Sequence, residues 1–312
     1  MSSEANRIVK VSVIQQGPAT KDKEERIREL LKQVDEVAEK EHPDFLLASE
    51  LSTTQYFPAG SFEPKYFSWA EPIPGPATER FGEKAKKYGI CIILPMFEKS
   101  SIESVYYNSA AVIGPDGNII VGMMPDGTKV LRYAKVHIPY TPSSANIITE
   151  RFYFKEGPGF PVFDTPKAKI GILICFDRHY PESFRMLALQ GAEIAFVPVA
   201  SPTKFVFGSQ SGASAKDMYT PELQTRALEN CMWVCSANRV GLEEVHDQKT
   251  QFYGLSTIIH PSGKVVLQAS SEQPEVISSE IDLEDNSTVR HSIALFKLRR
   301  PEVYGLIDKP MS

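Results

Sequence analysis

Cys175 stands at a position where a thiol could do chemistry. It follows the largely apolar run 169–174 and is followed by Phe-Asp-Arg-His-Tyr and then Pro181. The apolar run predicts a buried strand, and a proline suits the first turn of a helix, so we expect Cys175 on an elbow between the two. A thiol there can act as a nucleophile, and backbone N–H groups near a helix start can stabilise an oxyanion. A core cysteine is the alternative, because free cysteine is among the most buried residue types.

Two more polar residues are placed by strand-like segments, one just past the end of a segment and one inside a segment. Glu50 comes two residues after the apolar run 44–48, and Lys135 lies in the extended segment 131–139. Taken singly, each is most simply a solvated charge. Taken with Cys175, they place an acid, an amine and a thiol in one order along the chain, which are the groups needed to cleave an amide.

The three segments resemble the motifs of the nitrilase, or carbon–nitrogen hydrolase, superfamily, and the resemblance spans nearly the whole sequence. In that family Glu, Lys and Cys in this order form the catalytic triad of a four-layer αββα sandwich, and the motifs match Glu50, Lys135 and Cys175. A second glutamate of the family matches Glu150. The sequence departs from the family at residues 48–49, which are Ala-Ser instead of the more usual Phe-Pro.

The resemblance implies a mechanism for each of these groups. Glu50 is expected to take the proton of Cys175, so that the thiolate adds to the carbonyl carbon, and Lys135 with the backbone N–H of Phe176 is expected to stabilise the oxyanion. Water then opens the thioester, and no cofactor is implied. Glu150 is expected to orient Lys135 or the substrate, with a surface salt bridge as the alternative.

The residues after Cys175 bear on the choice of amide. The guanidinium of Arg178 could bind a substrate carboxylate through two hydrogen bonds, and His179 follows it. This elbow is similar to the branch that splits N-carbamoyl amino acids or N-carbamoyl amines into amine, carbon dioxide and ammonia. Pairing of Arg178 with Asp177 or Glu182 is the alternative. Other candidates for the pocket wall, each with a structural role as the alternative, are Tyr56, Asn108, His137, Ser201 and Asn238.

Two other classes of function stay open beside this one. An aliphatic amidase or nitrilase would use the same chemistry on a small amide or nitrile. An inactive binding member is a different class, although a binding protein has no need of all three triad residues. A glutamine-fed synthetase would need an ATP-binding domain, and the sequence has no G-x-x-x-x-G-K-[ST] motif.

The elements around these residues predict a layered α/β domain. Hydrophobic periodicity predicts a strand at 9–14, an amphipathic helix at 21–41 and a strand at 44–48. The Asp-Gly turn at 116–117 predicts a hairpin. Helices are expected to start near Pro181 and Pro221, and further strands are expected at 168–175, 193–199, 232–237, 255–259 and 265–269.

Composition limits the partners and the compartment. The 312 residues include 34 basic and 39 acidic side chains, for a net charge of −5, which argues against a nucleic-acid or membrane surface. A charged N-terminal stretch and the lack of a run of about 20 apolar residues favour the cytoplasm. The other three cysteines read as core and not as metal ligands.

The chain is expected to form one domain with a tail. We assign residues 1–288 to the hydrolase domain and residues 289–312 to a C-terminal tail, which would dock on a partner subunit through Phe296 and Tyr304 or fold back on its own subunit. The resemblance implies a homodimer or a larger even-numbered homo-oligomer acting on a small-molecule amide.

Overall fold

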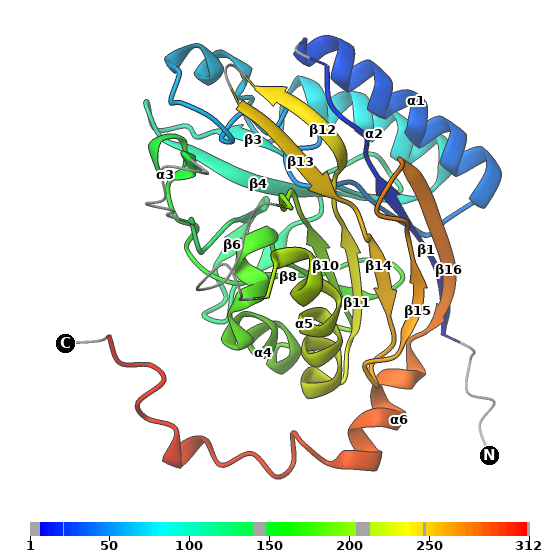
Figure 1. Ribbon diagram of the computed structural model, residues 1–312. Coiled ribbons are helices and arrows are strands. Elements are labelled where there is room, and N and C mark those ends of the chain that lie inside the picture. Colours follow the sequence, from blue (N-terminus) through cyan, green and yellow to red (C-terminus); the bar gives the residue numbers. More distant parts are fainter. Residues whose placement is uncertain (1–6, 21, 140–147, 204–212, 246–247, 311–312) are drawn as a thin grey trace.

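The computed structural model describes residues 7–310, except 21, 140–147, 204–212 and 246–247. Two β-sheets pack face to face, and helices cover the outer face of each sheet (Figure 1). The largest apolar cluster lies between the sheets and under the helices of one of them, and a second cluster lies under the helices of the other sheet. This arrangement confirms the expected αββα sandwich.

The first sheet has six strands, and its centre is parallel. Strands β1, β2 and β3 run in the same direction, while β16, β4 and β7 are antiparallel to their neighbours. Strand β2 is buried along its whole length, as expected for a strand with covered faces. The spatial order is β16 (Glu275–Asp282), β1 (Ile8–Gln15), β2 (Phe45–Leu47), β3 (Cys91–Lys99), β4 (Tyr106–Ile113) and β7 (Tyr133–Ala134).

The second sheet has eight strands, and its central three are also parallel. Its order is β15 (Val265–Gln268), β14 (Thr257–Ile259), β11 (Trp233–Ala237), β10 (Ile194–Pro198), β9 (Lys169–Ile172), β8 (Val162–Asp164), β5 (Gly122–Met123) and β6 (Lys129–Val130). A separate hairpin is formed by β12 (Val240–Val245) and β13 (Gln248–Tyr253).

Helices α1 (Lys23–Glu41) and α2 (Pro76–Tyr88) cover the first sheet, and α4 (Pro181–Leu189) and α5 (Ala215–Asn230) cover the second (Figure 1). Helix α1 forms as predicted, because Asp22 caps its first turn and its apolar residues share one buried face.

The predicted start of a helix near Pro221 was wrong. Helix α5 begins at Ala215, where the side chain of Ser214 accepts a hydrogen bond from Asp217 N, and Pro221 lies inside the helix. The serine cap fixes the start, and the proline is accommodated at the end of the second turn.

The C-terminal residues leave the body of the molecule. After α6 (Glu284–Ile293) the chain runs across open space in Figure 1. Phe296 packs between the guanidinium groups of Arg185 and Arg290, whereas Leu298 and Leu306 are 69% and 83% exposed. Among the described residues, no helix is long and apolar enough to cross a membrane.

Candidate active site

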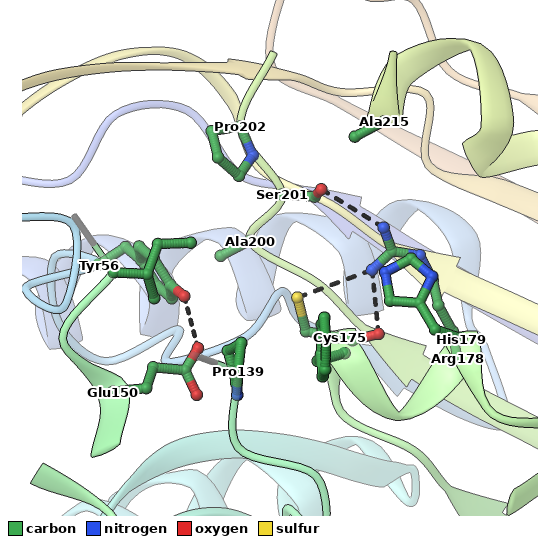
Figure 2. A pocket seen from close by; sticks show the side chains of 12 residues that line it. Tyr56, Pro139, Glu150, Cys175, Arg178, His179, Ala200, Ser201, Pro202 and Ala215 are labelled. Carbon is green, nitrogen blue, oxygen red and sulfur yellow. Dashed lines mark hydrogen bonds between the residues drawn. The ribbon is translucent and has the colours of Figure 1, made fainter. Parts of the chain in front are cut away.

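Cys175 lies on a tight elbow at the carboxyl end of β9. It opens the 3-10 turn η2 (Cys175–His179) with a φ of +50°, a left-handed conformation that is uncommon for a residue with a side chain. The elbow is held by Asp177, whose carboxylate accepts a hydrogen bond from Ile174 N at 3.0 Å. Cys175 is 8% exposed, and its thiol points into a pocket of about 410 Å³, a volume that includes the open solvent at its mouth (Figure 2). The predicted strand-to-helix elbow is therefore present.

Glu50, Lys135 and Glu150 form one fully buried ionic cluster. Lys135 Nζ donates to Glu50 Oε1 at 2.8 Å and to both carboxylate oxygens of Glu150 at 2.8 Å. All three residues are 0% exposed. Glu150 therefore lies in a buried ion pair and not in the surface salt bridge that was the alternative.

The elements bring these groups to one edge of the sandwich. Glu50 follows β2, Lys135 follows β7, and Glu150 opens the short helix α3 (Glu150–Tyr153). Cys175 follows β9 in the opposite sheet. Carboxyl ends of parallel strands collect at one edge of a sheet, so two facing sheets can present residues to the same pocket.

The buried charges act on one another and on the thiol. Burial by itself lowers the pKa of Lys135, but the two carboxylates together raise it by more than burial lowers it. The net pKa is therefore raised, and Lys135 stays an ammonium. Burial raises the pKa of Glu150 to about 7, although Lys135 opposes the rise. Burial and the Glu50 charge raise the pKa of Cys175 to about 12, while Lys135 and Arg178 act in the opposite direction. The resting thiol is therefore protonated at neutral pH.

One oxygen of Glu50 is left for chemistry. Oε1 accepts hydrogen bonds from Lys135 Nζ and from Asn108 Nδ2, both at 2.8 Å. Oε2 is buried and has no hydrogen-bond partner among the described residues. A buried carboxylate oxygen without a partner is costly in a purely structural site, and a proton acceptor needs such an oxygen.

Tyr56 is a second hydrogen-bond partner of Glu150, beside Lys135. Its hydroxyl donates to Glu150 Oε1 at 2.5 Å, and both residues line the pocket with Cys175 (Figure 2). The sequence singled out Tyr56 only as a polar residue for the wall, and its contact with the second glutamate could not be seen there.

Arg178 and His179 line the same pocket and are both bound to Glu222 of α5. Glu222 lies 3.2 Å from Arg178 Nε and 2.8 Å from His179 Nδ1. Arg178 Nη1 also donates to the carbonyl of Cys175 at 3.0 Å, and Nη2 donates to Ser201 Oγ at 3.4 Å (Figure 2). The guanidinium thus has an internal acidic partner, but it is Glu222 and not Asp177 or Glu182.

Asp177 has a different task, which is to join the nucleophile elbow to the lysine segment. Its carboxylate accepts the hydroxyl of Tyr133 at 2.5 Å and bonds to His137 N and Nδ1 at 2.8 Å. Tyr133 and His137 flank Lys135 by two residues on each side, so one carboxylate fixes Lys135 relative to Cys175. His137 stacks on Tyr180 and is not among the described residues that line the pocket.

Asn238 is fully buried and joins backbone segments through its side-chain amide. Its side-chain oxygen accepts from Ser201 N and Arg239 N, and its nitrogen donates to the carbonyl of Gly254. These contacts fit the loop-bracing alternative and leave the pocket wall to its neighbour Ser201. The described residues contain no group of three or more side chains placed to hold a metal ion.

Sequence reasoning missed three charged residues that contact the residues of this site or their backbone, namely Glu222, Arg239 and Glu243. Each is a charged residue within a helix, a strand or a turn, and its sequence neighbours give no sign that it is buried. No signal in a single sequence could have identified them.

Comparisons with known proteins identify the family and the fold of this chain. Residues 10–291 match the family model described as carbon-nitrogen hydrolase. The chain is 32% identical to an N-carbamoylputrescine amidase of Solanum lycopersicum, over 98% of this chain and 96% of that protein. It is 33% identical to a nitrilase of Pyrococcus abyssi, over 95% and 99% of the two chains. A crystal structure of a carbon-nitrogen hydrolase from Helicobacter pylori G27 covers 98% of this chain and is itself fully covered, at a TM-score of 0.84 and 26% identity.

Proposed function

Because this chain belongs to the carbon–nitrogen hydrolase family, in its N-carbamoyl amine branch, we propose that it hydrolyses a small N-carbamoyl amine to the amine, carbon dioxide and ammonia. The observation that carries the proposal is the buried cluster of Glu50, Lys135 and Glu150, whose charges act on the thiol of Cys175. Glu150 and Cys175 line the same pocket. An acid, an ammonium and a thiol are the three groups that an attack on a resonance-stabilised carbonyl requires.

In the first step the Cys175 thiol adds to the carbonyl carbon. Its raised pKa requires a base, and Oε2 of Glu50, which has no hydrogen-bond partner within the described part of the chain, takes the proton as the S–C bond forms. The carbonyl oxygen becomes an oxyanion, which the Lys135 ammonium and the backbone N–H of Phe176 stabilise. One of the two C–N bonds at the carbonyl carbon then breaks. Glu50 returns its proton to the nitrogen that leaves, either as ammonia or as the amine.

In the second step water opens the thioester. Glu50 takes a proton from the water, the hydroxide adds to the thioester carbon, and the C–S bond breaks with return of the proton to sulfur. The carbamic acid that is released decomposes to carbon dioxide and to the second nitrogen product, which is the amine if ammonia left first and ammonia if the amine left first. Glu150 keeps Lys135 charged and directed throughout.

The wall of the pocket favours a carbamoyl amine, which has no carboxylate, over a carbamoyl amino acid. Arg178 is the positive side chain that could bind a substrate carboxylate, but Glu222 balances its charge, and two of its nitrogens donate to the protein. The remaining wall is largely apolar and includes Ile148, Ala200 and Pro202. The relatives named N-carbamoylputrescine amidase support the same class.

A substrate panel tests the proposal. The panel contains N-carbamoylputrescine, N-carbamoyl-β-alanine, N-carbamoyl-D- and L-amino acids, simple amides and nitriles, each scored by ammonia release. We expect the highest kcat/KM for a carbamoyl amine. Activity on simple amides or nitriles alone would move the chain to the aliphatic amidase or nitrilase alternative, and no release from any compound would favour an inactive binding member.

We also propose that residues 289–312 are a tail that packs on a partner subunit in a homodimer or larger even-numbered assembly. Exposed apolar side chains such as Leu298 and Leu306 are unusual for a segment that stays in water.

A further inference from the structure

Arg239 is the largest side chain in the described structure that has almost no exposed surface. It stands between β11 and β12, and its guanidinium reaches the turn that follows β2. Nη2 donates to the carbonyls of Glu50 at 3.0 Å, Leu51 at 2.8 Å and Thr54 at 2.8 Å, and Nε also points to the Glu50 carbonyl at 3.3 Å. One cation thus closes the whole turn that carries the proposed base.

That turn would not hold its shape without help. Leu51, the residue after Glu50, has a φ of +50°, which is sterically unfavourable for a leucine. Among the described residues the carbonyl groups of this turn form no strand hydrogen bonds, and the turn is buried away from water, so they need hydrogen-bond donors from the protein. The Arg239 guanidinium supplies those donors, so the direction of the Glu50 side chain depends on it.

Glu243 completes the unit on β12. One of its oxygens accepts from Arg239 Nη1, and the other accepts from the backbone N–H of Tyr56 at 3.0 Å. Tyr56 in turn donates its hydroxyl to Glu150. The pair therefore holds both carboxylates of the ionic cluster, Glu50 through the turn and Glu150 through Tyr56.

We propose that Arg239 and Glu243 are positioning residues that set the two carboxylates on either side of Lys135, and that they act on the reaction through Glu50. This inference rests on the proposed function of Glu50 as the base. Neither residue lines the pocket among the described residues, so neither is expected to touch the substrate. A shift of about 1 Å in a catalytic group can cost on the order of 10²-fold in rate.

The alternative is that the pair only stabilises the fold, and alkylation of Cys175 separates the two roles. Iodoacetamide at pH 7.5 is followed by mass spectrometry of the Cys175 peptide in wild type, Arg239→Lys, Glu50→Gln and the double variant. Lysine keeps the charge but lacks the fork that reaches several carbonyls. We expect Glu50→Gln and Arg239→Lys each to slow alkylation about tenfold or more, and the double variant to be no slower than Glu50→Gln.

Two further variants complete the test. One tests Glu243, and the other is a control for a general loss of stability. Glu243→Gln keeps an acceptor for Tyr56 N but removes the ion pair, and we expect it to slow alkylation as well. Phe81→Leu creates a defect in the apolar core under α2 and removes no hydrogen bond of the turn, and the alkylation rate should stay at the wild-type value at a temperature equally far below its Tm. With the carbamoyl substrate, Arg239→Lys should lower kcat at least tenfold with KM within about twofold of wild type.

The results overturn different statements. Wild-type alkylation in Arg239→Lys, or a further slowing in the double variant, would overturn the inference and leave Glu50 as the base. Wild-type alkylation in Glu50→Gln would overturn the proposed role of Glu50, and the inference would fall with it.

Discussion

Replacement of Lys135 by methionine tests the buried ionic cluster most directly. The ammonium makes three hydrogen bonds of 2.8 Å to Glu50 and Glu150, and all three side chains are 0% exposed. Without it two carboxylates remain buried and lose the cation that bonds to both of them. Breaking a buried pair by removing one partner costs about 3–5 kcal/mol, so we expect Lys135→Met to lose that much free energy of unfolding near pH 8.

The loss should depend on pH in a definite direction. The pKa of Glu150 is already raised to about 7 by burial, and removal of Lys135 takes away the charge that opposes the rise. Above pH 7 the wild-type Glu150 has lost its proton, whereas the folded variant keeps it and the unfolded variant does not. Stability falls with pH wherever the folded state binds more protons, so the gap between variant and wild type should widen from pH 6 to 8.5, by up to about 1.4 kcal/mol per unit.

Urea unfolding of both proteins at pH 6 and 8.5 measures this gap. A second variant, Lys135→Met with Glu150→Gln, removes one of the two stranded carboxylates and should lose most of the pH dependence. Ammonia release should fall by at least about 10²- to 10³-fold at both pH values, because an oxyanion donor is lost. A gap that is the same at both pH values would refute the reasoning that uncompensated buried charge causes the loss.

Three shorter predictions follow from the same site, and a fourth concerns the C-terminal tail. Cys175→Ala should keep the wild-type circular dichroism spectrum and release no ammonia, and retained activity would remove Cys175 from the mechanism. In Glu50→Gln, burial keeps the pKa of the Cys175 thiol high, so its alkylation rate should still be rising at pH 9.5; a plateau below pH 8 would contradict a protonated resting thiol. Arg178→Ala should change KM equally for substrates with and without a carboxylate, because Glu222 balances the charge, and a selective rise for carboxylates would restore the carbamoyl amino acid interpretation. Truncation after residue 293 should lower the oligomeric mass seen by light scattering, and an unchanged mass would argue against the tail as a subunit contact.

Local patterns in the sequence were enough for the elements near the catalytic groups. The apolar run before Cys175 and the periodicity of 21–41 predicted a strand and a helix that are present as β9 and α1. These signals are local, since burial of one face imposes a period of two or 3.6 residues. The start of α5 was misplaced because Pro221 is a frequent first-turn residue, while the cap at Ser214 decides the boundary.

The order of Glu50, Lys135 and Cys175 along the chain pointed to amide chemistry because each residue type supplies one requirement of that reaction, and the resemblance to a family joined them. What each charged residue contacts could not be predicted in the same way. Arg178 was considered against acids close to it in sequence, yet its partner Glu222 comes from another element. Ion pairs between distant segments leave no periodic trace in one sequence.

The sequence by itself therefore determined the types of the reacting groups, the layered α/β class and most of the nearby elements, because these follow from side-chain chemistry and local periodicity. Only the tertiary structure decided that Glu150 is buried on Lys135 and that one oxygen of Glu50 has no partner among the residues that the structure describes. It also decided that Arg239 bonds to the turn that carries Glu50 and to Glu243. The physical reason is that burial and hydrogen-bond partners arise when strands far apart in the chain meet at one edge, and charges acquire their energies only from that shared environment.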